Sequence, residues 1–400
     1  MISIISKIQK HGIRGSFHII RNLICMPLRR IEYSIFRLFP IDYKLIIFES
    51  QPDFCDNAWA LYQYLKGTQK YRFVWIVVNP KFYNQNEDTV FVSRYGSGLR
   101  LKAYWYYSRA KYNIYTHCTM PEFVKHGDQV LIYTGHSCSV KAGKGSGTVG
   151  FDYTLMIGEN TIRPQSRFLQ CDEKKIIPLG FPRNDLLLRN SSRGSNNPFA
   201  TGHNEKVLLW MPTFRKSVQD SLSEQSCDTE TGLPLMAKED DVKDLNKFLL
   251  GIGVEIIVKI HHLQADKPVF SKTYSNIIFV TDGDLMKQGI QLYEMIGKTD
   301  ALITDYSSVG FDYLLLDKPI GYILDDMNSY MADRGFVWDN VLDVMPGSHI
   351  YDKQQYYDFL SEMKEGIDNY AMQRARVKDY IYGNIGDDRS CERFETFFLK

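Results

Sequence analysis

From Tyr43 onward, short apolar runs alternate with segments whose apolar residues recur at helical spacing. Short apolar runs predict buried strands, and the longer segments between them predict helices. A first series of predicted strands covers Leu45–Phe48, Phe73–Val78, Val90–Val92, Tyr112–Tyr115, Val130–Tyr133 and Tyr153–Ile157. A second series covers Val207–Met211, Val254–Lys259, Asn276–Val280, Ala301–Thr304 and Ile320–Leu324. Strands that alternate with helices predict parallel sheets covered on both faces, and therefore an α/β fold.

The predicted helices lie between these strands and after the last of them. They cover Asn57–Leu65, Gly98–Ala110, Val242–Leu250, Gln291–Gly297, Ser307–Leu316, Lys353–Lys364, Asn369–Tyr380 and Ser390–Phe398. A polar stretch, 190–198, separates the two series and predicts two doubly wound, Rossmann-like domains, 45–190 and 199–350, with C-terminal helices, 351–400, packing back across them. Ligands of such sheets bind at the carboxyl ends of the strands, so we expect a site in a central cleft between the domains. The polar segment 217–233 predicts a loop.

Charge is concentrated in residues 1–44, which carry eight Lys or Arg against two acidic residues, a net +6, whereas the whole chain carries +1. Large apolar residues lie among these cations at helical spacing. The pattern fits a basic amphipathic helix lying on an anionic membrane surface. It fits equally a helix that packs on its own domain and turns a solvated basic face outward, and the sequence leaves both interpretations open.

Composition excludes several classes of protein. With 44% hydrophobic and 24% charged residues the chain is globular, and the near-zero net charge gives no indication of a nucleic-acid partner. The seven cysteines are scattered without a C-x-x-C pair, which argues against a disulfide framework or a zinc site and suggests a reducing compartment. No apolar run approaches the roughly 18 residues of a spanning helix, and no signal-peptide pattern is present. No metal site is expected from ligand spacing, but dependence on a divalent cation stays open because Mg²⁺ needs only one or two carboxylates besides substrate phosphate.

The segment 300–320 holds the densest group of candidate residues. An apolar strand runs into Thr304 and Asp305, and a helix is expected to begin near Ser307 and Ser308. The start of a helix leaves backbone N–H groups without helical partners and carries the positive end of the helix dipole. With two hydroxyls beside it, such a start suits a phosphate or pyrophosphate. The alternative is that Asp305 or Ser307 only caps the helix.

Another strand of the second series ends in Met211 and Pro212, followed by Thr213 and Arg215. An arginine at a strand end can bind a phosphate through two parallel hydrogen bonds. The alternative is an ordinary surface arginine.

The strand that ends at Lys259 continues into His261 and His262. Alternation along the strand puts Lys259 and His261 on the same side. Two polar groups leaving an apolar strand are costly unless each meets a partner, so the pair is a candidate for the site. A histidine satisfied inside the core is the alternative.

In the first series, the strand at 130–133 leads through Gly135 to His136 and then to a loop rich in Gly and Lys, including Lys141. A histidine has a near-neutral intrinsic pKa, which suits it to take a proton from an alcohol. The loop can approach a phosphate but does not fit the P-loop pattern. The alternative is a turn histidine in a flexible loop.

At these residues the sequence resembles the CDP-glycerol glycerophosphotransferase family, the teichoic-acid polymerases and primases of bacterial cell walls. The best match is 302–319, from Leu-Ile-Thr-Asp-Tyr-Ser-Ser to Lys-Pro. Further matching motifs are Met211–Arg215, Gly180–Asp185, Arg334–Phe336 with Pro346–Gly347, and Asp387–Arg393. Where the family has Trp-His-Gly-Thr-Pro-x-Lys this chain keeps only His136 and Lys141 in register, and Lys-x-His-Pro becomes 259–262. The resemblance covers 112–400.

The resemblance implies a GT-B-like fold and transfer of a polyol phosphate from a CDP-linked donor to an acceptor hydroxyl with release of CMP. Glycerol phosphate is the polyol phosphate that we expect. His136 would be the general base. His261 would be the second catalytic residue, holding the diphosphate and offsetting charge as CMP departs. The other residues expected to bind the donor are Thr213, Arg215, Lys259, Thr304, Ser307 and Ser308, with Asp305 orienting their loop. Lys141 and Arg183 would belong to the acceptor side or its loop. The resemblance also implies a lipid-linked or polysaccharide acceptor and a peripheral position on the cytoplasmic face of the cell membrane.

Two other functions remain compatible with the residues. A GT-B nucleotide-sugar glycosyltransferase would bind the diphosphate in the same way but transfer a sugar carbon. A non-catalytic nucleotide-binding or scaffold protein of polysaccharide assembly would bind the donor without turnover, and the altered loop around His136 is the feature that would favour it.

Overall fold

The computed structural model describes residues 25, 27–84, 87–95, 100–117, 119, 124–143, 150–212, 229–260 and 267–399. The chain divides into two compact units. Unit 1 comprises 1–136 with 148–154, and unit 2 comprises 137–147 with 155–400. The domain bounds expected from the sequence stay a prediction.

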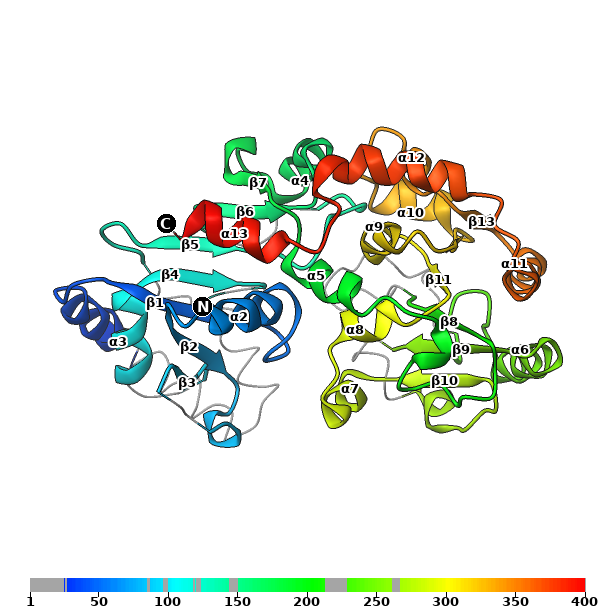
Figure 1. Cartoon of the computed structure of the whole chain (residues 1–400), viewed down its shortest axis with the longest axis horizontal. Coiled ribbons are helices and arrows are strands. Elements are labelled where there is room, and N and C mark those ends of the chain that lie inside the picture. The colour runs from blue at the N-terminus through cyan, green and yellow to red at the C-terminus, as the bar shows by residue number, and fades with distance from the viewer. Residues whose placement is uncertain are drawn as a thin grey trace, which may run out of the picture. The chain divides into compact units, whose positions relative to one another are not determined.

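A seven-stranded sheet, in the order β3-β2-β1-β4-β5-β6-β7, forms the centre of the N-terminal half (Figure 1). Its strands are β1 (Asp42–Glu49), β2 (Arg72–Val77), β3 (Thr89–Ser93), β4 (Ala110–Tyr115), β5 (Val130–Tyr133), β6 (Tyr153–Met156) and β7 (Ile176–Pro178). The pairings from β3 across to β6 are all parallel. The chain therefore builds outward from β1 in one direction and then returns to the other side of β1 with β4.

Both faces of β1 are covered in unit 1, which explains its continuous apolar run. On one face Leu45 and Ile47 pack with α3 (Leu101–Arg109) and with Tyr33 of the helix at 27–36. On the other face Phe48 stacks on Trp75 and meets Tyr62 of α2 (Asp56–Thr68). A strand buried on two sides has no polar face to alternate with.

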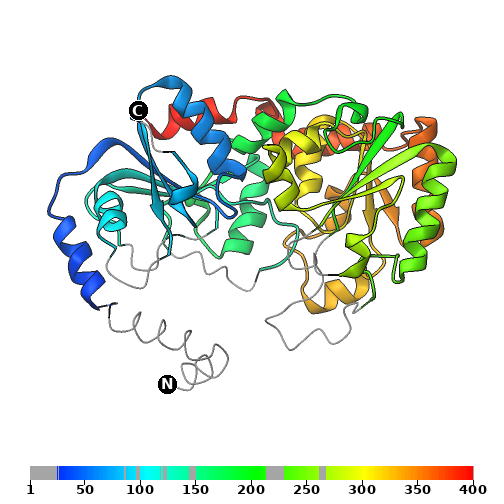
Figure 2. The same ribbon diagram turned by 90° about the horizontal axis from the view of Figure 1, so that it is seen from below.

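Unit 2 has a six-stranded sheet in the order β10-β9-β8-β11-β12-β13, with parallel pairings throughout. The strands are β8 (Lys206–Trp210), β9 (Val254–Lys259), β10 (Ile277–Val280), β11 (Ala301–Thr304), β12 (Ile320–Ile323) and β13 (Ser348–Ile350). The helices of this unit are α4 (Ile162–Leu169), α5 (Pro182–Arg189), α6 (Glu239–Ile252), α7 (Asp282–Gln288), α8 (Leu292–Gly297), α9 (Val309–Tyr313), α10 (Met327–Asp333), α11 (Lys353–Glu365), α12 (Ala371–Tyr382) and α13 (Ser390–Phe398). In both views α6 and α11 run beside the sheet (Figures 1 and 2), and their apolar residues share one core with it.

The predicted α/β class with two parallel sheets is confirmed, and every strand expected from an apolar run is present. Two strands were missed, β7 and β13, because three residues are too few to show a pattern. The helix expected from Ser307 begins at Val309, and a 3₁₀ turn, Leu314–Leu316, extends it. The basic segment is described only from residue 25, with 26 left out, and 1–24 lie outside the described residues.

None of the helices within the described part of the chain is both long enough and apolar enough to cross a membrane.

Candidate functional site

In unit 1 the direction of winding reverses between β1 and β4. Ligands of doubly wound sheets bind at the carboxyl ends of the strands at such a point. The residues there are Glu49 at the end of β1, Thr116 and His117 after β4, and His136 shortly after the neighbouring β5.

A buried asparagine shapes the turn that presents His136. Asn57, at the start of α2, is fully buried, and its amide donates to the carbonyl oxygens of Thr134 (3.2 Å) and Gly135 (3.1 Å). Gly135 has a φ of +65°, a conformation that side chains other than glycine rarely adopt. The backbone therefore turns sharply after β5 and leaves the His136 side chain exposed.

The imidazole of His136 stacks on a second histidine that sequence reasoning did not single out. The ring centroids of His117 and His136 are 4.4 Å apart and the rings are 1° from parallel. Thr116 contacts both rings, with its carbonyl oxygen 3.4 Å from Nδ1 of His136 and its hydroxyl 2.8 Å from Nδ1 of His117. The sequence clue was that both histidines follow the ends of adjacent strands.

Glu49 lies at the same edge and is buried with a cation. Its carboxylate accepts from Nε of Arg94 (3.0 Å) and from the hydroxyl of Tyr107 (2.8 Å). Burial raises the pKa of Glu49 to about 7, because loss of hydration outweighs the attraction of Arg94. This carboxyl group is therefore a structural element whose charge changes near neutral pH.

Because the pKa of Glu49 is higher in the folded chain than in the unfolded chain, folding loses stability as the pH rises. We expect the wild-type protein to lose about 2 kcal/mol of unfolding free energy between pH 5 and pH 7, and Glu49→Gln to remove this loss. The loss levels off once the pH exceeds the folded pKa. Urea unfolding of both proteins at pH 5, 6 and 7 measures this difference. Glu159→Gln, at an exposed carboxylate, is the matched control. Equal slopes for wild type and Glu49→Gln would contradict the prediction.

In unit 2 the direction of winding reverses between β8 and β11. The two strand ends are joined there, because Thr304 Oγ1 donates to the carbonyl oxygen of Met211 (3.0 Å) and Met211 N–H donates to Ile303 (2.8 Å). Thr304 and Asp305 are buried, whereas Ser307 and Ser308 are half-buried. Thr213 and Arg215, which follow β8, lie outside the described residues.

Lys259 ends β9, the strand beside β8. It is buried, and its ammonium lies 2.8 Å from the carboxylate of Asp282 and 3.1 Å from the carbonyl oxygen of Ile260. The polar group that leaves the apolar strand therefore has the partner that burial demands. His261 lies outside the described residues.

Arg183 is buried away from water inside unit 2. Its guanidinium forms an ion pair with Asp312 of α9 (2.7 Å), and each side chain is 1% exposed. Tyr293 of α8 donates to the same carboxylate (2.6 Å), and the guanidinium lies over the Tyr293 and Phe181 rings. These contacts join α5, α8 and α9, and α9 directly follows Ser307 and Ser308 in the chain.

The Gly180–Asp185 motif and its neighbour Leu179 contact the Asp387–Arg393 motif. Asp185 accepts from the backbone N–H groups of Ser390 and Cys391 (both 2.9 Å) and so holds the first turn of α13. Arg393 donates through Nε to the carbonyl oxygen of Leu179 (2.9 Å). Segments about 205 residues apart in the sequence are thus joined, and no pattern along the chain indicates which motif pairs with which.

The loop after His136 forms backbone contacts with the Arg334–Phe336 motif. Lys141 pairs with Phe336 in an antiparallel bridge, and Ala142 N–H donates to Gly335 (3.0 Å). Phe336 in turn lies beside Tyr306 and Tyr330, whose rings stack at 4.2 Å. Within unit 2, the loop that carries Lys141 is therefore connected through aromatic side chains to the residue next to Ser307.

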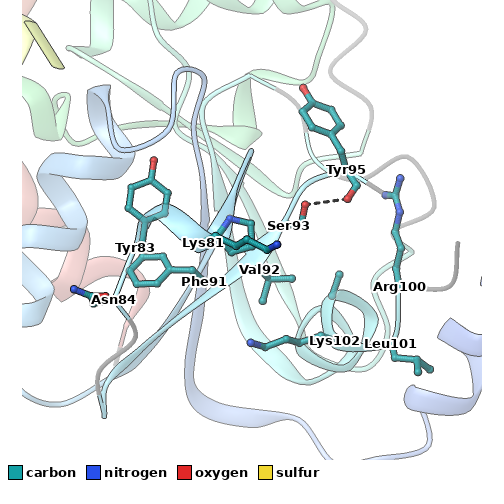
Figure 3. Close-up of a pocket in the computed structure, with 12 residues that line it drawn as sticks. Lys81, Tyr83, Asn84, Phe91, Val92, Ser93, Tyr95, Arg100, Leu101 and Lys102 are labelled. Atoms are coloured by element: carbon teal, nitrogen blue, oxygen red, sulfur yellow. Dashed lines mark hydrogen bonds between the residues drawn. The ribbon is translucent and has the colours of Figure 1, made fainter. Parts of the chain in front are cut away.

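Unit 1 has an open pocket of about 740 Å³ lined by the turn after β2, by the end of β3 and by the start of α3. Its walls include the cations Lys81, Arg100 and Lys102 and the rings of Tyr83 and Tyr95 (Figure 3). None of the residues singled out from the sequence lines it.

Among the described residues, no group of three or more His, Cys, Asp or Glu side chains could hold a metal ion.

The fold and the two strand-end sites define a GT-B-like α/β protein. Its structure is similar to that of the wall teichoic acid polymerase TagF, with a TM-score of 0.72, 20% identity and 99% of this chain and 97% of the other covered. The family model of CDP-glycerol:poly(glycerophosphate) glycerophosphotransferases matches residues 31–398. The chain belongs to this family, as the motifs predicted.

Curated relatives agree with the family. A teichoic acid glycerol-phosphate primase of Bacillus subtilis (strain 168) is 27% identical over 62% of this chain and 57% of its own length. A teichoic acid glycerol-phosphate transferase of Staphylococcus aureus (strain NCTC 8325 / PS 47) is 25% identical over 92% of this chain and 97% of its own length. The chain spans about half the length of several of the curated relatives it matches.

Proposed function

We propose that this protein transfers glycerol phosphate from CDP-glycerol to an acceptor hydroxyl, with release of CMP, in the synthesis of teichoic acid or a related phosphopolyol polymer. The family match over residues 31–398 carries the proposal. It is supported by the names of the curated relatives, which act with glycerol phosphate or ribitol phosphate.

Unit 1 would act on the acceptor. His136, exposed at the reversal edge, takes the proton from the attacking hydroxyl. The loop with Lys141 follows it directly in the sequence, belongs to unit 2 and would bind the acceptor side. As the hydroxyl oxygen bonds to the phosphorus of the glycerol phosphate group, the bond to the CMP oxygen breaks and CMP leaves.

Unit 2 would hold the donor. The hydroxyls of Ser307 and Ser308 donate to the diphosphate, while Thr304 and the buried Asp305 fix the loop from behind. Thr213 would donate its hydroxyl to the diphosphate, and Arg215, Lys259 and His261, at or after the ends of the neighbouring strands, would supply the positive charge that CMP departure needs. Arg183 would serve here as a structural residue, because its guanidinium is held by Asp312.

Removing the donor hydroxyls should weaken binding of the donor. Hydrogen bonds to a charged group are worth about 1.5–3 kcal/mol, so we expect Ser307→Ala and Ser308→Ala each to raise KM for CDP-glycerol about tenfold or more. Initial rates of CMP release measure this effect. Ser361→Ala, on α11, is the control. An unchanged KM in both variants would remove these serines from the donor site.

The donor test separates the proposed function from its alternative. The full chain is incubated with CDP-glycerol, and separately with UDP- and GDP-sugars, in the presence of a glycerol-phosphate primer. We expect CMP release and primer extension with CDP-glycerol alone. Transfer from the sugar nucleotides alone would instead establish a glycosyltransferase, and donor binding without turnover a scaffold.

We also propose a lipid-linked or polysaccharide acceptor and peripheral association with an anionic membrane. The helix at 27–36 supports the second point, because Leu28, Ile31 and Ile35 form a stripe at 50–59% exposure beside the exposed Arg30. Exposed apolar residues next to cations suit a lipid surface with negative headgroups.

Membrane binding is measured by sedimentation with vesicles. We expect the full chain to bind vesicles containing anionic lipid and not neutral vesicles at the same salt concentration. The double variant Ile31→Ser, Ile35→Ser should weaken vesicle binding about tenfold or more, because it removes two apolar side chains that would be buried in the lipid. Met372→Ser, at an 80% exposed methionine of α12, is the control. Equal binding by the double variant would place the contact elsewhere.

A further inference from the structure

We infer that His117 is a positioning residue for His136: its ring is the platform that fixes the plane of the imidazole that takes the acceptor proton. The inference rests on the proposed role of His136. It concerns unit 1 alone, and its observations are the parallel rings 4.4 Å apart and the contacts of Thr116 with both.

An exposed histidine on a turn would otherwise rotate among its side-chain conformers. His136 follows a glycine in a left-handed conformation, and its backbone is held through the Asn57 amide. These contacts fix where the side chain begins but not the orientation of its ring. The stack with His117 restricts the ring plane, because rotation about the ring-bearing bond would separate the two faces.

The Thr116 carbonyl fixes the second variable, the tautomer. A carbonyl oxygen can only accept, so its contact with Nδ1 of His136 favours the form with hydrogen on Nδ1. The basic lone pair is then on Nε2, at the far side of the ring. Plane and tautomer together aim one nitrogen in one direction, and both come from consecutive residues at the end of β4.

His117 is itself held in place. The Thr116 hydroxyl hydrogen-bonds to its Nδ1 at 2.8 Å, and its side chain is only partly exposed. The more restrained ring therefore restrains the more exposed one. A misplacement of about 1 Å can cost about a hundredfold in rate, so the platform should matter for turnover more than for donor binding.

The test compares two substitutions of one residue. His117→Ala removes the ring and should lower kcat by about ten- to a hundredfold, with KM for CDP-glycerol nearly unchanged. His117→Phe keeps a flat ring and should restore most of kcat. In a His136→Ala background, His117→Ala should have no further effect. A His117→Ala variant with wild-type kcat, a Phe variant as slow as the Ala variant, or additive losses in the double variant would each overturn the inference.

A measurement independent of activity separates this inference from the proposed function. In protein labelled at histidine, the His136 ring resonances are assigned by their loss in His136→Ala. Stacking places them in the ring current of His117, so they should move downfield in His117→Ala and stay near their wild-type positions in His117→Phe. Resonances that do not move in His117→Ala would overturn the stack even if the enzyme proves inactive toward CDP-glycerol. If they move as expected in an inactive enzyme, the stack stands and the proposed function fails.

Discussion

Replacing His136 with alanine is expected to lower CMP release from CDP-glycerol by at least about a hundredfold, because a positioned general base contributes about 10²–10⁴-fold to rate. The loss should appear in kcat, since the imidazole acts on the acceptor proton and not on the donor. The exposed position of the side chain means that its removal leaves no cavity in the core. The measurement is the initial rate at saturating donor and acceptor.

The matched control for this prediction is His203→Ala, which removes an exposed histidine from unit 2. It should retain wild-type turnover, and both variants should unfold at the wild-type urea concentration. A His136→Ala variant that keeps turnover within about threefold of wild type falls outside the range of general-base effects and would reject the histidine as the base. Loss of stability in that variant, in contrast, would show that the Gly135 turn depends on the ring.

The second large effect is expected on stability, from the ion pair between Arg183 and Asp312. Removing one partner leaves the other charge buried without compensation, which costs about 3–5 kcal/mol in proteins. Because both side chains are 1% exposed, water cannot reach the remaining charge. We expect Arg183→Met to lose about this much free energy of unfolding, measured by urea denaturation.

The double variant Arg183→Met, Asp312→Leu should recover part of that loss, because it removes both charges. The control is Arg189→Ala, which breaks a pair with Asp388 whose side chains are each 49% exposed and should cost less than about 1 kcal/mol. If Arg183→Met proved as stable as that control, the prediction that this ion pair stabilises the fold would be wrong.

The sequence motifs were informative about the family but not about which residues face a ligand. The Gly180–Asp185 and Asp387–Arg393 motifs resemble the Thr304–Ser308 segment in composition, since all three combine charged residues with hydroxyls or glycine. Only packing distinguishes these motifs, because Asp185 accepts a hydrogen bond from the backbone of Ser390 and Arg183 forms an ion pair with Asp312. Partners distant in sequence decide whether a charged group is available, and one sequence does not show them.

Local pattern alone determined the α/β class, the two series of strands and the strand ends where polar residues collect. These features depend on neighbours within a few positions, through apolar runs, helical spacing and turns, so they are visible along the chain. The tertiary structure decided the strand order, which places the reversal beside Glu49 in unit 1, and it decided that His117 lies on His136. Those facts follow from which strand pairs with which, a choice made by long-range burial and hydrogen bonding, and so they become visible only when the chain is folded.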